Sequence, residues 1–155
     1  MLTEGVYPEA LTILERAVSL QPNSAAAQYN LGLAQLKEKK YEEAIASNKK
    51  ALALKPEWPD AYNNLGLAYA GLARWKEAVA AYSEAVRLVP GGAYAGALYN
   101  LGHAYLSLGE KSATREIIDK VKPLNHDLQA RLWLELLAID RPVPAAPSPE
   151  PSPSP

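Results

Sequence analysis

Few side chains in this 155-residue chain could do covalent or acid–base chemistry. The chain has no cysteine, and its two histidines, His103 and His126, do not form a pair at metal-ligand spacing. No H-E-x-x-H motif and no nucleophile elbow occur. We therefore expect no enzyme activity, no cofactor and no metal site, and we expect the functional residues to be recognition residues.

The side chains best suited to recognition are three asparagines in a recurring motif. The motif reads YNLG at 29–32, YNNLG at 62–66 and YNLG at 99–102, and an asparagine precedes the leucine in each copy: Asn30, Asn64 and Asn100. A primary amide carries two donors and an acceptor, so each asparagine could pair with the backbone of a bound peptide. Each such bond contributes only about 1 kcal/mol net, which would fix the register of a peptide without dictating its sequence.

Composition narrows the possible partners. The net charge is −1, so no strong field attracts nucleic acid or an anionic membrane. No apolar run approaches the roughly 18 residues that span a bilayer, and the first ten residues lack the basic and apolar parts of a signal peptide. We therefore expect protein or peptide partners, no nucleic acid, no membrane insertion and a cytoplasmic location.

The motifs lie in segments with helical periodicity. Apolar residues recur at i, i+3, i+4 and i+7 in segments such as AAAQYNLGLAQLKEKK, and again in second segments such as WKEAVAAYSEAVRL. Pro22, Pro56 and Pro90 follow the second segments, where a proline ends a helix. Because the linkers are short, the two helices of each unit must run antiparallel.

These helix pairs repeat at a nearly constant spacing. Gly32 and Gly66 are 34 residues apart, and Gly66 and Gly102 are 36 apart. A glycine inside a helix costs roughly 1 kcal/mol relative to alanine, so three glycines at equivalent positions need a packing reason. We expect them to let the two helices of a unit approach closely, with Gly102 facing larger counterparts in the last unit and with Gly32 and Gly66 facing small residues of the second helix. Those residues are Ala44, Ala51, Ala78 and Ala85.

The repeating unit, for example NLGLAYAGLARWKEAVAAYSEAVRLVP, resembles the tetratricopeptide repeat (TPR) family, over about residues 1–125. The resemblance implies an all-α fold, a right-handed α-α solenoid of antiparallel helical hairpins whose first helices line a concave groove for peptides or proteins. We expect a capping helix at its C-terminal end. The predicted units are a partial repeat at 1–22, repeats at 23–58, 59–92 and 93–125, a capping helix at 126–141 and a disordered Pro/Ser-rich tail at 142–155.

The side chains of the first helices divide between two faces. The leucine and glycine of each motif should face the second helix, and the preceding asparagine points about 100° away, toward the groove. Residues one before and three after each asparagine share that direction. The resemblance implies that TPR proteins which bind a charged C-terminus do so with lysines and an arginine in this groove. The equivalent positions of this chain hold neutral residues, so we do not expect a clamp for a charged C-terminus. The predicted groove residues are Tyr29, Asn30, Leu33, Asn63, Asn64, Leu67, Tyr99, Asn100 and His103.

Polar residues also occur where the repeat usually has apolar ones. Gln35 and Asn48 fall in one hairpin, and we expect their amides to hydrogen-bond to each other. Asn63 stands where the other units have tyrosine, so we expect the middle of the groove to be more polar than its ends.

Both ends of the repeat array could contact other chains. The helix predicted at 8–20 has one face less covered, and the capping helix carries Trp133, Leu134 and Leu137 beyond its inward stripe. Three functions therefore remain open. The first is a non-enzymatic module that binds a peptide in its groove, and the second is a scaffold that self-associates through one of these ends, for example as a homodimer. The third is a targeting or regulatory fragment of a larger enzyme.

Overall fold

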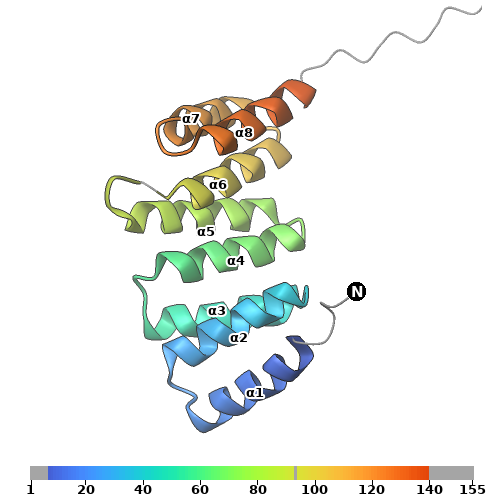
Figure 1. The fold of residues 1–155 in the computed structure, drawn as a ribbon, viewed down its shortest axis with the longest axis vertical. Helices are drawn as coiled ribbons and strands as arrows, with labels where there is room; N and C mark the ends of the chain where they lie inside the picture. The colour runs from blue at the N-terminus through green and yellow to red at the C-terminus, as the bar shows by residue number, and fades with distance from the viewer. Residues whose placement is uncertain (1–6, 93, 140–155) are drawn as a thin grey trace, which may run out of the picture.

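The computed structural model describes residues 7–92 and 94–139, and in this part of the chain helices joined by short connections are present and no strand is (Figure 1). The predicted tail at 142–155 lies outside the described residues. The elements are α1 (Tyr7–Leu20), α2 (Ala25–Lys37), α3 (Tyr41–Leu54), α4 (Pro59–Gly71), α5 (Trp75–Leu88), the short 3-10 helix η1 (Pro90–Gly92), α6 (Ala95–Ser107), α7 (Lys111–Val121) and α8 (His126–Ile139).

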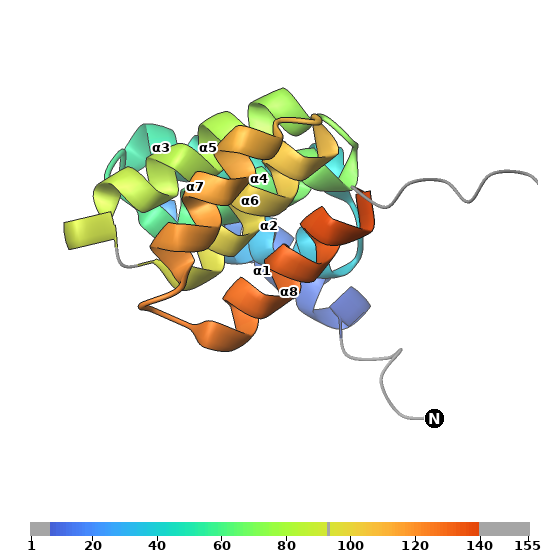
Figure 2. The ribbon, with the colours of Figure 1, turned by 90° about the horizontal axis from the view of Figure 1, so that it is seen from above.

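The helices form the predicted α-α solenoid. Helices α1 to α7 succeed one another along the long axis in chain order, and α8 lies at the level of α7 (Figure 1). Each pair α2–α3, α4–α5 and α6–α7 is an antiparallel hairpin (Figure 1). Seen along that axis, α3, α5 and α7 overlap on one side, α2, α4 and α6 lie beside them, and α8 lies on the side of these first helices (Figure 2). The predicted boundaries after residues 22, 58, 92 and 125 fall between α-helices, the one after residue 141 lies outside the described residues, and the division into units stays a prediction.

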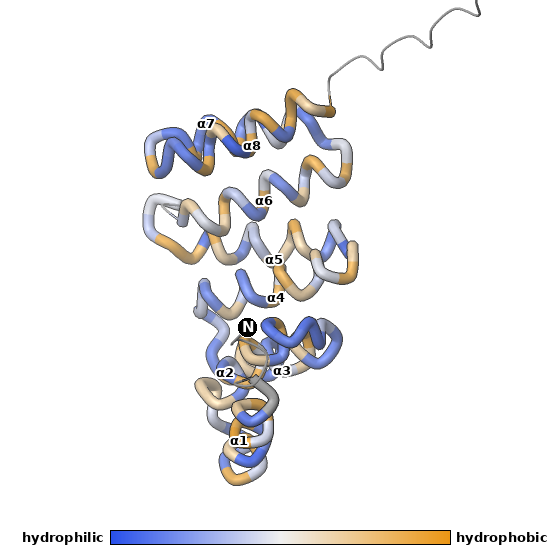
Figure 3. Tube along the Cα trace, turned by 45° about the vertical axis from the view of Figure 1, so that its right-hand side comes forward, coloured by the Kyte–Doolittle hydropathy of each residue, from blue (hydrophilic) through white to orange (hydrophobic). Residues whose placement is uncertain are grey.

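Local signals set where the helices begin and end. Ser24 caps α2 by accepting a hydrogen bond from the Ala27 amide at 3.2 Å. Asn125 caps α8, because its side-chain oxygen accepts a hydrogen bond from the Leu128 amide at 3.0 Å. Pro59 occupies the first position of α4, where its missing N–H costs nothing. Hydrophobic and hydrophilic residues are interspersed along the helices (Figure 3), as expected of helices that bury one side and expose the other.

The space beside each motif glycine is filled by a larger side chain of a neighbouring helix, and the nearest atoms are not those of the alanines expected to face Gly32 and Gly66. A Cβ on Gly32 would lie 2.5 Å from Nδ2 of Asn48, and one on Gly66 would lie 2.5 Å from Cε1 of Tyr82. Gly102 faces Leu132 of α8 and Ile117 of α7. The glycine is therefore needed because the facing side chain occupies the space that a Cβ would take.

The predicted hydrogen bond between Gln35 and Asn48 does not form. The Ser47 hydroxyl donates to Oε1 of Gln35 at 2.7 Å, and Nδ2 of Asn48 donates to the Ala44 carbonyl at 2.8 Å. Oδ1 of Asn48 is buried without a partner. Asn48 packs against Gly32, one turn before Gln35, so the neighbouring serine is the group that reaches the glutamine.

Candidate functional site

Three hollows open between successive first helices. The α2–α4 hollow has a volume of about 240 Å³, the α4–α6 hollow about 350 Å³ and the α6–α8 hollow about 300 Å³. The α2–α4 hollow is lined by Leu33, Leu36, Lys37, Tyr41, Asn64 and Leu67. The α4–α6 hollow is lined by Leu67, Ala70, Gly71, Trp75, Tyr82, Tyr99, Asn100 and His103. The α6–α8 hollow is lined by His103, Leu106, Ser107, Glu135, Ala138 and Ile139.

Neighbouring hollows share a residue. Leu67 lines the first two, and His103 lines the last two. The hollows therefore follow one another along the first helices from α2 to α8, and we call this row the groove. It lies on the side chosen from the sequence as the recognition face.

Six of the nine predicted groove residues line the hollows: Leu33, Asn64, Leu67, Tyr99, Asn100 and His103. The other three do not. Asn30 is exposed, and Tyr29 stacks on Trp58, with ring centroids 4.4 Å apart. Asn63 is half-buried on α4. Most of the residues chosen from the sequence therefore line the hollows, and their role in binding a ligand stays a prediction.

Tyr29 belongs to a cluster at the edge of the groove. Burial raises the pKa of its hydroxyl above the usual value, the Asp60 carboxylate raises it further, and the Asn64 amide opposes them. Asp60 itself accepts a hydrogen bond from the Tyr94 hydroxyl at 2.7 Å. This cluster joins α2, α4 and the start of α6, so its rings and carboxylate hold neighbouring repeats together.

Two of the predicted recognition amides bind each other. Nδ2 of Asn100 donates to Oδ1 of Asn63 at 3.1 Å, which links α6 to α4. This bond occupies one donor and one acceptor in the middle of the groove. Asn63 therefore offers a ligand fewer free hydrogen-bonding groups than expected. The aromatic rings beside it make the α4–α6 hollow mainly apolar.

Asn64 differs from the other two motif asparagines because it is buried. Only 6% of its surface is exposed, and its Nδ2 has no hydrogen-bond partner of acceptable geometry. An unpaired donor at such a site costs about 1–3 kcal/mol. The chain retains this donor in the wall of the α2–α4 hollow.

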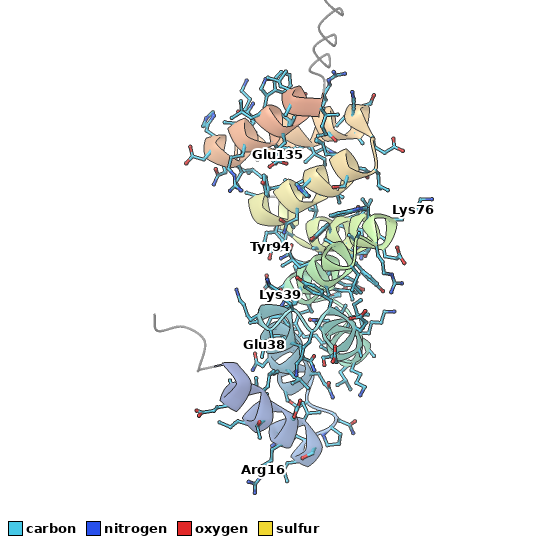
Figure 4. All side chains as sticks on the ribbon, turned by 90° about the vertical axis from the view of Figure 1, so that its right-hand side faces the viewer. Arg16, Glu38, Lys39, Lys76, Tyr94 and Glu135 are labelled. Carbon is cyan, nitrogen blue, oxygen red and sulfur yellow. The ribbon has the colours of Figure 1, made fainter. Side chains whose placement is uncertain are left out.

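The far end of the groove is polar. The Tyr99 hydroxyl donates to Oε1 of Glu135 at 2.9 Å and accepts from Nη2 of Arg131 at 3.1 Å. Oε2 of the same glutamate lies 3.9 Å from Nε2 of His103. Burial is the main cause that raises the pKa of the Tyr99 hydroxyl, and the hydrogen bond to Glu135 adds to it. Figure 4 labels Glu135 of this end and Tyr94 of the cluster described above.

On the opposite side, Lys76 projects from α5 away from the first helices (Figure 4).

Sequence reasoning missed several lining residues. Tyr41 and Trp75 each begin a second helix and line the hollow beside it. Their equivalent positions and aromatic type were a readable signal. Ala70 is another lining residue that sequence reasoning missed. Leucine stands at the equivalent position in the neighbouring repeats, at Leu36 and Leu106. The smaller side chain leaves the α4–α6 hollow the largest of the three.

Within 7–92 and 94–139, no group of three or more acidic or histidine side chains could hold a metal ion. None of the helices described there has the length and apolarity needed to cross a membrane. The cytoplasmic location stays a prediction.

Comparison with known families settles the classification. Patterns described as "Tetratricopeptide repeat" match residues 2–59, 59–91 and 95–122, which together cover most of the chain. The chain belongs to the tetratricopeptide repeat family. TPR units form protein-interaction scaffolds, so this chain is a protein-interaction module. No curated protein sequence matches it.

Solved structures share its fold. A structure described as MamA, residue 41 to the end, from Desulfovibrio magneticus RS-1 is 29% identical with a TM-score of 0.72, over 78% of this chain and 67% of that one. A crystal structure of MamA protein is 25% identical with a TM-score of 0.67, over 90% of this chain and 70% of that one. The TPR solenoid is therefore the common architecture.

Proposed function

We propose that the chain is a non-enzymatic TPR module whose groove holds an extended or helical segment of a partner protein. The observation that supports this most is the row of three hollows that share Leu67 and His103. A peptide side chain could enter each hollow while its backbone follows the first helices. Grooves of this kind bind through a few buried side chains, and a single segment typically gains about −8 kcal/mol, a micromolar dissociation constant.

Leu67 offers a direct test because it lies between two hollows and is 38% exposed. Leu67→Glu places a charge in the middle of the groove without removing a buried core contact. Leu54→Glu is the matched control, since Leu54 is 43% exposed at the end of α3 and lines none of the three hollows. Both variants should fold, which circular dichroism would check.

The measurement is affinity capture from cell extract, followed by hydrogen exchange on a recovered complex. We expect partners that bind the wild type and Leu54→Glu but not Leu67→Glu. We also expect added exchange protection in α2, α4 and α6. Equal recovery by the two variants, or protection confined to α3, α5 and α7, would contradict the groove as the binding site.

A second candidate function is self-association through α8, supported by its outer face. Leu132 and Leu136 are buried, whereas Trp133, Leu134 and Leu137 are 43%, 64% and 46% exposed. With Ala130 they form a stripe at i, i+3, i+4 and i+7, the pattern of a helix that packs on another helix. This is the exposed patch expected from the sequence.

Sedimentation velocity over a hundredfold concentration range tests this candidate. If α8 drives association, Trp133→Gln with Leu137→Gln should give a monomer at every concentration. Ile13→Gln with Leu20→Gln alters the exposed apolar residues of α1 and should leave the association intact. A wild type that is monomeric throughout would exclude the candidate.

A further inference from the structure

We propose that the segment bound in the groove presents a large uncharged side chain, aromatic or aliphatic, to the α4–α6 hollow and a carboxylate side chain to the α2–α4 hollow. This inference rests on the groove function proposed above. It specifies the chemistry of the ligand at two of the three hollows.

The α4–α6 hollow has the lining of an anchor pocket. Rings of Trp75, Tyr99 and His103 line it, and none of its lining side chains is an acid, a lysine or an arginine. Trp75 and His103 lie 5.9 Å apart at an interplanar angle of 59°. Aromatic walls favour apolar and aromatic side chains, which supply most of the affinity when they fill a pocket at the centre of an interface. An ion placed there would lose hydration without gaining a charged partner.

The size of this hollow follows from Ala70. Leucine holds the equivalent position in both neighbouring repeats, at Leu36 and Leu106. Each of these leucines lines its own hollow, so the fold accommodates a leucine at this repeat position. The alanine thus provides space for a ligand side chain, and a leucine in its place would fill that space.

The α2–α4 hollow has donors without acceptors to match them. Nδ2 of Asn64 is buried and makes no hydrogen bond of acceptable geometry, although the amide lies close enough to the Tyr29 hydroxyl to lower the pKa of that group. Lys37 is the charged residue in the lining. No acidic side chain lines this hollow. The nearby Asp60 accepts a hydrogen bond from the Tyr94 hydroxyl at the edge of the groove. A carboxylate accepts strongly from both an amide and an ammonium group, and the apolar walls of Leu33 and Leu67 would strengthen these bonds.

Because Leu67 separates the two hollows, the ligand's acidic and apolar residues must lie close together in its sequence. Their order along the groove is fixed, with the acidic residue toward α2 and the apolar one toward α6. The charge at this one hollow therefore selects the charge of the ligand residue that enters it, although the chain as a whole carries a net charge of only −1.

The probe for this proposal is a phage-displayed library of random 12-residue peptides, selected on the wild-type chain. We expect enriched peptides to share Phe, Tyr, Trp, Leu or Met with Asp or Glu on one constant side. The most enriched peptide is then synthesised with a fluorophore, and its binding to variants is measured by anisotropy. Enriched peptides without this pair would overturn the proposal.

Ala70→Leu tests the anchor pocket. We expect it to weaken the synthetic peptide at least tenfold and to have no further effect on a peptide whose large side chain is replaced by alanine. Ala80→Leu makes the same change at an exposed position of α5 and should bind within twofold of wild type. Equal affinities of Ala70→Leu and Ala80→Leu would contradict the pocket.

Asn64→Leu and Lys37→Gln test the carboxylate site. Asn64→Leu should raise the urea midpoint of the free chain, because it removes an unpaired buried donor, and should weaken the acidic peptide at least fivefold. If Asn64 had a purely structural role, Asn64→Leu would change the urea midpoint and leave the affinity for the peptide unchanged. Lys37→Gln should weaken the peptide and reduce its salt dependence, whereas Lys76→Gln, which alters the lysine that projects away on α5, should do neither.

The outcomes separate this proposal from the groove function. If Leu67→Glu abolishes binding while Ala70→Leu and Asn64→Leu bind like wild type, the groove function stands and the proposed ligand chemistry is wrong. If no peptide is enriched, or the enriched peptide binds Leu67→Glu as tightly as wild type, both proposals fail.

Discussion

Gly66 illustrates how one contact can require a residue that is a poor helix former. Alanine in its place would gain about 1 kcal/mol of helix propensity. However, the added Cβ would lie 2.5 Å from Cε1 of Tyr82, which is only 2% exposed. We expect Gly66→Ala to lower the free energy of unfolding by about 2 kcal/mol, because the ring cannot move without disturbing the core. Urea denaturation followed by circular dichroism would measure it.

Gly96 is the matched control for this prediction. It lies in the first turn of the next first helix, and a Cβ there would meet nothing nearer than Cε2 of Tyr94 at 3.8 Å. Gly96→Ala should therefore raise stability by up to about 1 kcal/mol. If both substitutions change stability in the same direction, the ring contact is not what requires the glycine.

The Gln35–Ser47 hydrogen bond gives a second prediction at this scale. Both side chains are buried, and the bond is 2.7 Å long. In a double-mutant cycle, Gln35→Leu and Ser47→Ala should show a coupling of about 1 kcal/mol, because either substitution alone leaves the other polar group unpaired. The cycle that combines Gln35→Leu with Asn48→Leu should be nearly additive. Coupling in the second cycle but not in the first would contradict the hydrogen bonding described above.

Single residues were also where sequence reasoning reached its limit. The repeat spacing identified Gln35 and Asn48 as polar residues inside a hairpin, and the structure buries both. It could not identify their partners, because these depend on side-chain rotation and on a serine that no motif contains. The same holds for Asn64, whose burial differs from that of Asn30 at the equivalent position.

At the scale of elements, the turns inside the hairpins share a strained conformation. Lys39, Ala73 and Gly109 stand at equivalent positions with φ of 58°, 56° and 78°. Only the last is a glycine, the residue that adopts this left-handed region at little cost. Ala73→Gly should therefore raise the free energy of unfolding by about 1 kcal/mol, measured by urea denaturation.

Two further substitutions serve as controls for the prediction on Ala73→Gly. Ala80→Gly, at an exposed interior position of α5, should lower stability by about 1 kcal/mol, since it meets only the helix-propensity cost. Gly109→Ala should also lower stability. A loss in Ala73→Gly as large as in Ala80→Gly would mean that the turn conformation stores no strain.

The helices themselves were the most predictable feature. Periodicity located the helices of each hairpin, and Pro22, Pro56 and Pro90 marked where α1, α3 and α5 end, because these signals act within a few residues. The placement of α8 was not predictable in detail. Its Leu132 packs against Gly102 of α6, and its Glu135 reaches Tyr99, contacts that depend on how the capping helix lies over α6 and α7. The α6–α8 hollow follows from this placement.

Across the whole molecule, apolar burial is divided between two clusters. The larger runs from α3 to α8, and the smaller joins α1 to α2 around Leu11, Leu31 and Ala34. Buried polar side chains, Gln35, Ser47 and Asn48, lie in the α2–α3 hairpin where the clusters meet. Because each repeat of a solenoid contacts only its neighbours, a polar layer at one interface should weaken the coupling across it.

This arrangement predicts uneven stability along the solenoid. Native-state hydrogen exchange should give lower opening free energies for α1 and α2 than for α5 and α6, because opening the first unit exposes the small cluster and leaves the large one intact. The difference should be at least about 1 kcal/mol, since the layer also holds the unpaired Oδ1 of Asn48.

The double substitution Gln35→Leu and Asn48→Leu tests whether the polar layer causes this difference. Apolar side chains at both positions would join the two clusters and remove the unpaired oxygen, so the opening free energies of α1 and α2 should rise toward those of α5 and α6. Exchange in α7 should not change, because no substituted residue contacts it and coupling falls with each intervening repeat. If α1 and α2 still open first and by the same margin, their lower stability comes from their position at the end of the array. The polar layer would then have a cost in stability but no part in dividing the solenoid.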